Sequence, residues 1–295
     1  MTGVTVEETD YRAWEDCLRL SNGVIELVVT VGMGPRVLAC GFVDGENHFY
    51  TDEDKEPLLD DYVIHGGHRL WHAPEDVERT YVVDEDPVEW TETDRGIRLH
   101  QQTEASTGIT KTISIAFAED DPEVEVTHEL ANDGVWTVEL APWAVTVMDG
   151  GGTAVVPLSQ GDPDAVLPDR SLSLWPYTDM TDERLTFGDE AILVDQTAAG
   201  EGPLKIGASA ADEWAAYVAD DEAFLKEFAY DETATYPDGG SAVEVYAGAD
   251  SLELETLGPL QELAPGESAV HTETWRLVEG VGDWESAPDL WAAIE

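Results

Sequence analysis

Apolar and polar residues alternate along most of this chain. Residues 23–32 (GVIELVVTVG) and 35–45 (PRVLACGFVDG) both have the period of two that is typical of a half-buried β-strand. The Gly32-Met33-Gly34 segment between them would turn the pair into a hairpin. Residues 79–104 have the same pattern and predict two or three more strands.

Three long strands are expected within residues 107–151. Two segments interrupt the alternation there, Asp120-Asp121-Pro122 and Asn132-Asp133-Gly134, and we expect both to be turns. An Asn-Asp-Gly segment between two alternating runs favours a hairpin, so the second and third of these strands are predicted to pair.

The rest of the chain continues the β pattern. Residues 150–200 are rich in Gly, Pro and Asp and predict long loops with short strands, whereas the residues beyond 212 alternate again. One short helix is expected at the C-terminal end, capped near Ser286. No repeat of fixed period and no linker is visible, so we predict one all-β domain over residues 1–295, a large antiparallel β-sandwich.

The most unusual feature of the composition is its large excess of acidic residues. There are 64 acidic residues against 14 Lys and Arg, a formal net charge of −50, while 42% of the residues are hydrophobic, enough for a core. The acids occur in every segment, which is typical of salt-accumulating halophiles such as haloarchaea; an acidic interaction surface is the alternative. In about 1 M salt the Debye length is only roughly 3 Å, so the repulsion is screened. Without a basic patch, nucleic acid is not an expected partner.

The sequence also bounds where the protein works. No apolar run of about 18 residues is present, so we expect no membrane span and no membrane partner. The first residues lack a basic segment followed by an apolar run, so no secretory signal is expected. Cys17 and Cys40 are interpreted as reduced thiols of a cytoplasmic protein, although a disulfide between them stays open. A monomer and a homodimer are both compatible with the sequence.

Three of the seven histidines lie in residues 63–76, VIHGGHRLWHAPED. On a helix His65, His68 and His72 would share nearly one face, but the glycine pair and Pro74 argue against a regular helix. Three convergent imidazoles could bind zinc, but no partner residues that would orient them are readable. We therefore predict no metal and no cofactor, and each histidine could instead be structural.

The C-terminal third carries a resemblance. Residues 252–277 read LELETLGPLQELAPGESAVHTETWRL, a strand ending in Leu-Glu-Thr followed by a Pro-Gly-Glu-Ser turn and a last strand. This resembles the galactose mutarotase-like superfamily, the aldose 1-epimerases and their carbohydrate-binding relatives. HGG at 65–67, residues 123–148 and YPDGGSAVEVYAG at 236–248 follow in the same order, so the resemblance covers roughly residues 25–278. It is closest to uncharacterised prokaryotic members, and it implies a β-supersandwich and a carbohydrate as small-molecule partner.

The resemblance also implies roles for particular residues. Glu255 matches the general base of the aldose 1-epimerases, and His65 matches a histidine that lines their sugar site. Anomer interconversion needs a base at the anomeric hydroxyl and an acid at the ring oxygen. Where active epimerases have an Asn-His pair that provides the acid, this chain has Ala141-Pro142-Trp143-Ala144. A histidine of residues 65–72 would have to replace that acid.

Strand alternation constrains Glu255. In LELET, Leu252 and Leu254 share one face of the strand, while Glu253 and Glu255 share the other. Glu255 can act on a sugar only if this second face bears the site. In so acidic a chain, a merely solvated carboxylate is the alternative.

Other candidates surround these two. Cations are scarce, so Arg69 is expected to hold a carboxylate of the protein or of an acidic sugar, and Lys226 raises the same question. Trp71 and Trp143 could stack on a sugar or belong to the core. Asp238 could bind a hydroxyl or merely form its turn.

Three functions follow as hypotheses. The first is a carbohydrate-binding protein that interconverts anomers with Glu255 and His65 as its catalytic pair. The second is carbohydrate recognition without catalysis. The third is a lyase or hydrolase acting on uronates. The expected substrate-binding residues are His68, Arg69, Trp71, His72, Trp143, Lys226 and Asp238.

Overall fold

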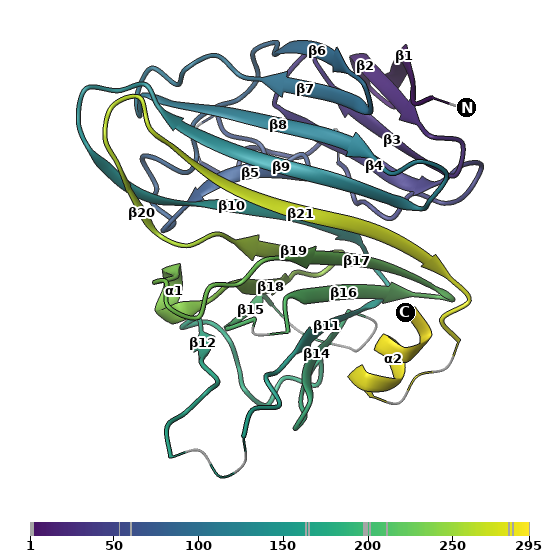
Figure 1. Cartoon of the computed structure of the whole chain (residues 1–295), viewed down its shortest axis with the longest axis vertical. Helices are drawn as coiled ribbons and strands as arrows, with labels where there is room; N and C mark the ends of the chain where they lie inside the picture. Colours follow the sequence, from purple (N-terminus) through teal and green to yellow (C-terminus); the bar gives the residue numbers. More distant parts are fainter. Residues whose placement is uncertain are drawn as a thin grey trace.

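Two stacked antiparallel sheets make up the protein (Figure 1). The computed structural model describes residues 3–294 except 53, 60, 163, 165, 197–199, 201, 211, 283 and 285. The first sheet has eleven strands. In spatial order they are β1 (Thr5–Tyr11), β2 (Trp14–Ser21), β3 (Ile25–Thr30), β4 (Arg36–Phe42), β5 (His68–Ala73), β10 (Val138–Asp149), β19 (Ser251–Leu257), β18 (Val243–Ala247), β15 (Leu204–Ala208) and β12 (Leu172–Leu174), with β20 (Gln261–Leu263) beside β10.

The second sheet has ten strands. In spatial order they are β13 (Leu185–Phe187), β14 (Ala191–Asp195), β11 (Thr153–Pro157), β16 (Trp214–Ala219), β17 (Glu222–Phe228), β21 (Ser268–Glu279), β9 (Glu123–Asn132), β8 (Ile109–Phe117), β7 (Gly96–His100) and β6 (Glu89–Thr93). This architecture confirms the all-β sandwich predicted from the alternation.

The main core lies between the two sheets. Leu70 and Leu254 of the first sheet and Ile113 and Trp275 of the second are all at most 3% exposed and belong to one continuous apolar cluster. Because side chains alternate along a strand, each of these residues has neighbours that point to the opposite, outer face of its sheet. We call the two faces of each sheet inner and outer below.

The Asn132-Asp133-Gly134 turn does not make a hairpin. β9 pairs with β8 and β21 of the second sheet, whereas β10 pairs with β5 and β19 of the first. The Asn132 amide donates to the carbonyl oxygens of Trp136 and Leu263, both at 2.8 Å, which anchors the chain as it crosses between sheets. The predicted pairing of these two strands was therefore wrong, although the turn itself forms.

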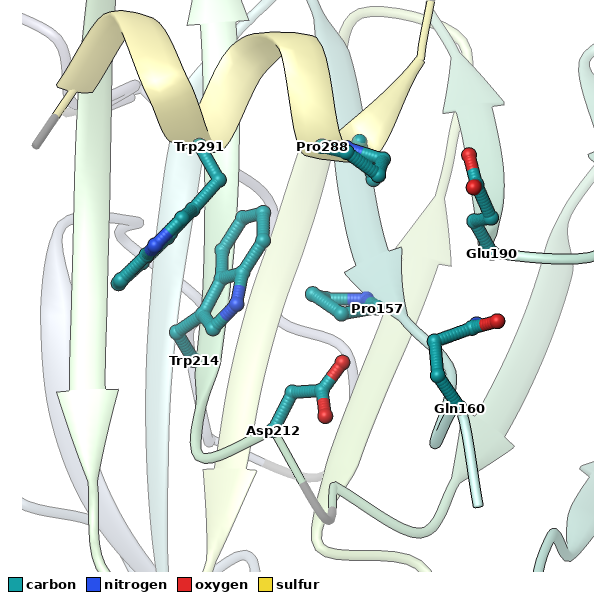
Figure 2. Close-up of a pocket in the computed structure, with 8 residues that line it drawn as sticks. Pro157, Gln160, Glu190, Asp212, Trp214, Pro288 and Trp291 are labelled. Carbon is teal, nitrogen blue, oxygen red and sulfur yellow. The ribbon is translucent and has the colours of Figure 1, made fainter. Parts of the chain in front are cut away.

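The predicted C-terminal helix is present as α2 (Ala287–Ile294). Its start is capped, because the Ser286 hydroxyl accepts a hydrogen bond from the backbone N–H of Asp289 at 3.3 Å. The helix covers the outer face of the second sheet, where the Trp291 and Trp214 rings lie 5.0 Å apart between centres (Figure 2). A cavity of about 360 Å³ opens beside this contact.

The remaining expectations concern cysteines and membranes. Cys17 and Cys40 are both buried and both free thiols. In the part of the chain that the structure describes, no helix has the length and apolar character needed to cross a membrane.

Candidate functional site

The histidine-rich motif lies on β5, and strand alternation divides it between two faces. His68 and His72 point inward, toward the second sheet, whereas Arg69 and Trp71 point outward. The glycine pair before the strand has a backbone reason. Gly67 has φ of +67°, and a Cβ there would lie 2.3 Å from the Val37 carbonyl oxygen, so no other residue fits without movement.

The inward face holds a buried polar cluster rather than a sugar site. His68 Nδ1 lies 2.8 Å from the Thr146 hydroxyl, and its Nε2 lies 2.7 Å from His128 Nε2. Lys226 Nζ contacts Glu273 Oε1 at 2.9 Å, with both side chains fully buried. His68 and Lys226 therefore take part in contacts between the sheets and not in a site with Glu255, contrary to the expectation from sequence.

Three groups of this cluster have the spacing of metal ligands. Ligand atoms of His68, His128 and Glu273 lie within 4.8 Å of one another. However, the two imidazoles are hydrogen-bonded to each other, and the Lys226 ammonium is already paired with the carboxylate. A divalent cation would have to break the hydrogen bond between the imidazoles and lie beside the ammonium, so the cluster is better described as a satisfied ionic network.

Three further predicted residues, His65, His72 and Asp238, lie apart from the outward-facing Arg69 and Trp71. His65 Nε2 is 3.1 Å from Glu85 Oε1, and its ring stands edge-on to Trp14. Burial, followed by the charge of Lys111, lowers the pKa of His72 to about 4. Asp238 belongs to the short turn α1 (Pro237–Gly240), where its backbone oxygen accepts a hydrogen bond from the Ser241 hydroxyl at 3.1 Å.

The outward face of the first sheet brings the other predicted residues together. Trp71 and Trp143 are cross-strand neighbours on β5 and β10, with ring centres 5.2 Å apart. The Arg69 guanidinium lies 4.0 Å from the Trp71 ring centre and 3.2 Å from Glu253. Arg69 thus holds a carboxylate of the protein itself, and its charge is neutralised.

Glu255 sits at the centre of this face, on β19. Its Oε2 accepts hydrogen bonds from the Trp143 indole N–H at 2.6 Å and from Lys205 Nζ at 2.9 Å. Lys205 Nζ also contacts Glu244 Oε2 at 2.7 Å and lies 4.6 Å from the Trp143 ring centre. Trp143, which occupies the place of the missing acid, therefore fixes the carboxylate of the expected base.

Burial controls the charges at this position. Glu255 and Glu244 are 0% and 1% exposed, and burial raises the pKa of both carboxyls, an effect that Lys205 partly opposes. Burial alone would lower the pKa of Lys205, but Glu255 and Glu244 together raise it, so its side chain is an ammonium. Glu255 Oε1 has no hydrogen-bond partner among the described residues.

A cavity of about 310 Å³ opens over this face. Its polar side chains include Lys205, Glu253 and Glu75, and Glu255 lies beneath them without lining it. Burial raises the pKa of Tyr177, on the wall, to about 12, so this phenol is a neutral hydrogen-bonding group. The remaining lining residues are Leu58, Ile64, Trp71, Tyr81, Trp143, Pro203 and Tyr246.

Sequence reasoning missed Lys205, Glu244 and the tyrosines of the wall. A signal for Lys205 was present, because a lysine inside an apolar run is unusual in a chain with so few cations. Tyr81 and Tyr177 come from loops, whose position over the sheet no periodicity predicts.

Comparison with known proteins identifies solved structures that have the same fold. Neither a scan against protein-family models nor a search of curated proteins finds a match. Solved structures do match. A galactose mutarotase-like protein from Lactobacillus casei has a TM-score of 0.59 at 9% identity, over 89% of this chain and 100% of that one. The fold is galactose mutarotase-like.

Two further structures have the same fold. A candidate aldose 1-epimerase from Klebsiella pneumoniae has a TM-score of 0.60 at 12% identity, covering 98% of this chain and 85% of its own. A TPR-domain containing protein from Parabacteroides distasonis has a TM-score of 0.62 at 14% identity over 92% of this chain, which spans only 49% of that protein. At these identities the galactose mutarotase-like likeness concerns the fold alone.

Proposed function

We propose that this protein binds a carbohydrate in the cavity over the outer face of the first sheet. The observation that carries the proposal is the lining of that cavity, which combines aromatic rings with a few charged groups. Pyranose rings have apolar C–H faces that pack on aromatic rings, and hydroxyls that need donors and acceptors at fixed positions. The names of the neighbouring folds, mutarotase-like and aldose 1-epimerase, favour the same ligand class.

Lys205 and Glu253 are the groups that would fix the orientation of the sugar. Two of the three N–H groups of the Lys205 ammonium are directed at Glu255 and Glu244, and the described residues leave the third for a ligand. The Glu253 side chain is 15% exposed and lines the cavity, so it can accept from a hydroxyl beside its contact with Arg69.

Anomer interconversion is the second candidate. Two features favour it: burial raises the pKa of Glu255 above its ordinary value, an effect that Lys205 partly opposes, and its Oε1 has no hydrogen-bond partner among the described residues. The acid would have to be Lys205 and not a histidine, since His65, the acid expected from sequence, contacts Glu85 and Trp14, and His68 and His72 face the other sheet. Against it, Glu255 is 0% exposed beneath Lys205 and Trp143.

Action on uronates is not favoured. A uronate carboxylate needs an available cation. The Arg69 guanidinium is 1% exposed and already paired with Glu253, and the Lys205 ammonium already lies within 2.9 Å of two carboxyl groups. We therefore retain the third hypothesis only as an outcome of the binding test.

The test is nuclear magnetic resonance of D-glucose, D-galactose, D-mannose, D-xylose and D-galacturonate with the protein in molar potassium chloride. We expect line broadening for one or more neutral aldoses. Tyr177→Ala should weaken that binding about threefold to tenfold, because it removes one aromatic wall. Trp136→Ala, which removes an exposed aromatic ring that does not line the cavity, is the control. No broadening with any sugar would reject the proposal.

Catalysis is tested in the same samples by exchange spectroscopy. Protein-dependent α/β exchange that Glu255→Gln abolishes would establish the second candidate. Binding without exchange would leave recognition as the function. Selective binding of galacturonate would contradict the view that neither Arg69 nor Lys205 is available to a ligand carboxylate.

A further inference from the structure

Two buried carboxyl groups share one ammonium beneath the cavity. Glu244 and Glu255 are cross-strand neighbours on β18 and β19, and Lys205 Nζ lies 2.7 Å from the first and 2.9 Å from the second. A buried carboxylate requires a counter-charge or hydrogen-bond donors to offset its lost hydration. One ammonium can neutralise only one of the two.

The donors are divided unequally between them. Glu255 Oε2 accepts from both Trp143 and Lys205. Glu244 has one partner, the Lys205 ammonium at 2.7 Å from its Oε2, and its Oε1 has no hydrogen-bond partner among the described residues. The carboxylate form is therefore better supported at Glu255, which has two N–H partners, than at Glu244, which has one.

The surroundings of Glu244 add to this difference. The titratable groups that face it are Lys205 on β15, Glu255 on β19 and Asp238 in α1, so two of the three are acids.

We propose that Glu244 is a neutral carboxylic acid at neutral pH and positions Lys205 for the ligand, while Glu255 stays ionised. The positioning part rests on the proposed function, whereas the protonation part does not. Burial raises the pKa of Glu244 well above its ordinary value, in agreement with the geometry. When the proton leaves, two carboxylates compete for Lys205, so ligand affinity should fall as the pH rises.

Glu244→Gln tests the protonation, since glutamine has the shape of the neutral acid. A group whose pKa is raised in the folded state binds more protons there than in the unfolded chain. Its contribution to stability is therefore lost as the pH rises from the unfolded pKa toward the folded one. The melting temperature of the variant minus that of the wild type should increase from about pH 5 to about pH 9. A constant deficit at every pH would overturn the inference.

Glu262→Gln is the control, because it removes one acidic charge at an exposed position of β20. Its difference from the wild type should not change in the same way. Glu255→Gln should lower the melting temperature throughout, since Lys205 would lose its ionised partner. If Glu244→Gln behaved like Glu255→Gln, Glu244 would be ionised and the inference wrong.

Ligand binding tests the positioning separately. With the panel aldose that binds best, Glu244→Gln should keep its affinity at about pH 7 within about threefold and lose the decline at higher pH. An unchanged decline would overturn the positioning role. A rising stability difference without any sugar binding would support the proton on Glu244 and reject the proposed function.

Discussion

The ion pair between the sheets allows the sharpest test of how this core is held together. Lys226 and Glu273 are both fully buried, with Nζ and Oε1 2.9 Å apart. Lys226→Met removes the ammonium at nearly constant volume and leaves Glu273 without its main counter-charge. Burial favours the protonated acid, yet the charges of Lys226 and His128 hold the pKa of Glu273 well below its usual range.

The cost follows from what remains around the carboxylate. Removing one partner of a buried pair costs about 3–5 kcal/mol. Glu273 keeps hydrogen bonds from Trp275 Nε1 and the Thr256 hydroxyl, so we expect the lower end, about 3 kcal/mol. At about 2–4 °C per kcal/mol, the melting temperature should fall by about 6–12 °C.

The assay is differential scanning calorimetry in molar potassium chloride, with Lys226→Met/Glu273→Gln as the matched double variant. Glutamine removes the unpaired charge but keeps an acceptor oxygen, so at least half of the loss should be recovered. A single-variant cost below about 1 kcal/mol would refute the view that this charge pair matters. A double variant less stable than the single one would assign the loss to packing and hydrogen bonds instead.

Three further predictions follow from the structure. Gly67→Ala should destabilise by about 2 kcal/mol or more in chemical denaturation, because its Cβ would meet the Val37 carbonyl; a smaller cost would contradict that geometry. The melting temperature should rise steeply with potassium chloride, since the net charge is −50; a flat response would reject the screening argument. The pKa of His72 is lowered to about 4, so its contribution to stability is complete above about pH 6.5 and falls toward pH 4. His72→Gln should therefore flatten the acid side of the stability profile, and an unchanged profile would show that the pKa of His72 is the same in the folded and unfolded states.

Strand alternation predicted most of the fold, and the failure at one turn has a specific cause. The strands before and after Asn132 were correctly placed, but the local Asn-Asp-Gly signal cannot tell a hairpin from a crossing between sheets. The crossing is supported by the hydrogen bond from the Asn132 side chain to the backbone oxygen of Leu263, a residue distant in sequence.

The candidate site was also predicted only in part, because some of its residues are brought together by contacts that are distant in sequence. Trp71, Trp143, Arg69 and Glu255 were all named, and the outer face of the first sheet brings them together. The histidine motif was not recognised as a strand, so His68 was grouped with them; the period of two of β5 places His68 on the face opposite to Arg69 and Trp71. Loops supply much of the cavity wall, and no local rule positions them.

The lysines of this chain identify its buried ionic contacts better than its histidines do. Of its four lysines, only Lys55 is exposed. Lys111 pairs with Glu104 at 2.6 Å, Lys226 with Glu273, and Lys205 with two carboxyls beneath the cavity.

Buried ammonium groups are expensive unless they are paired, and an acidic surface has little use for lysine. The lysines that such a chain keeps are therefore the ones that its interior requires. By that argument Lys205, which no motif singled out, is a better guide to the proposed binding site than any histidine of the sequence.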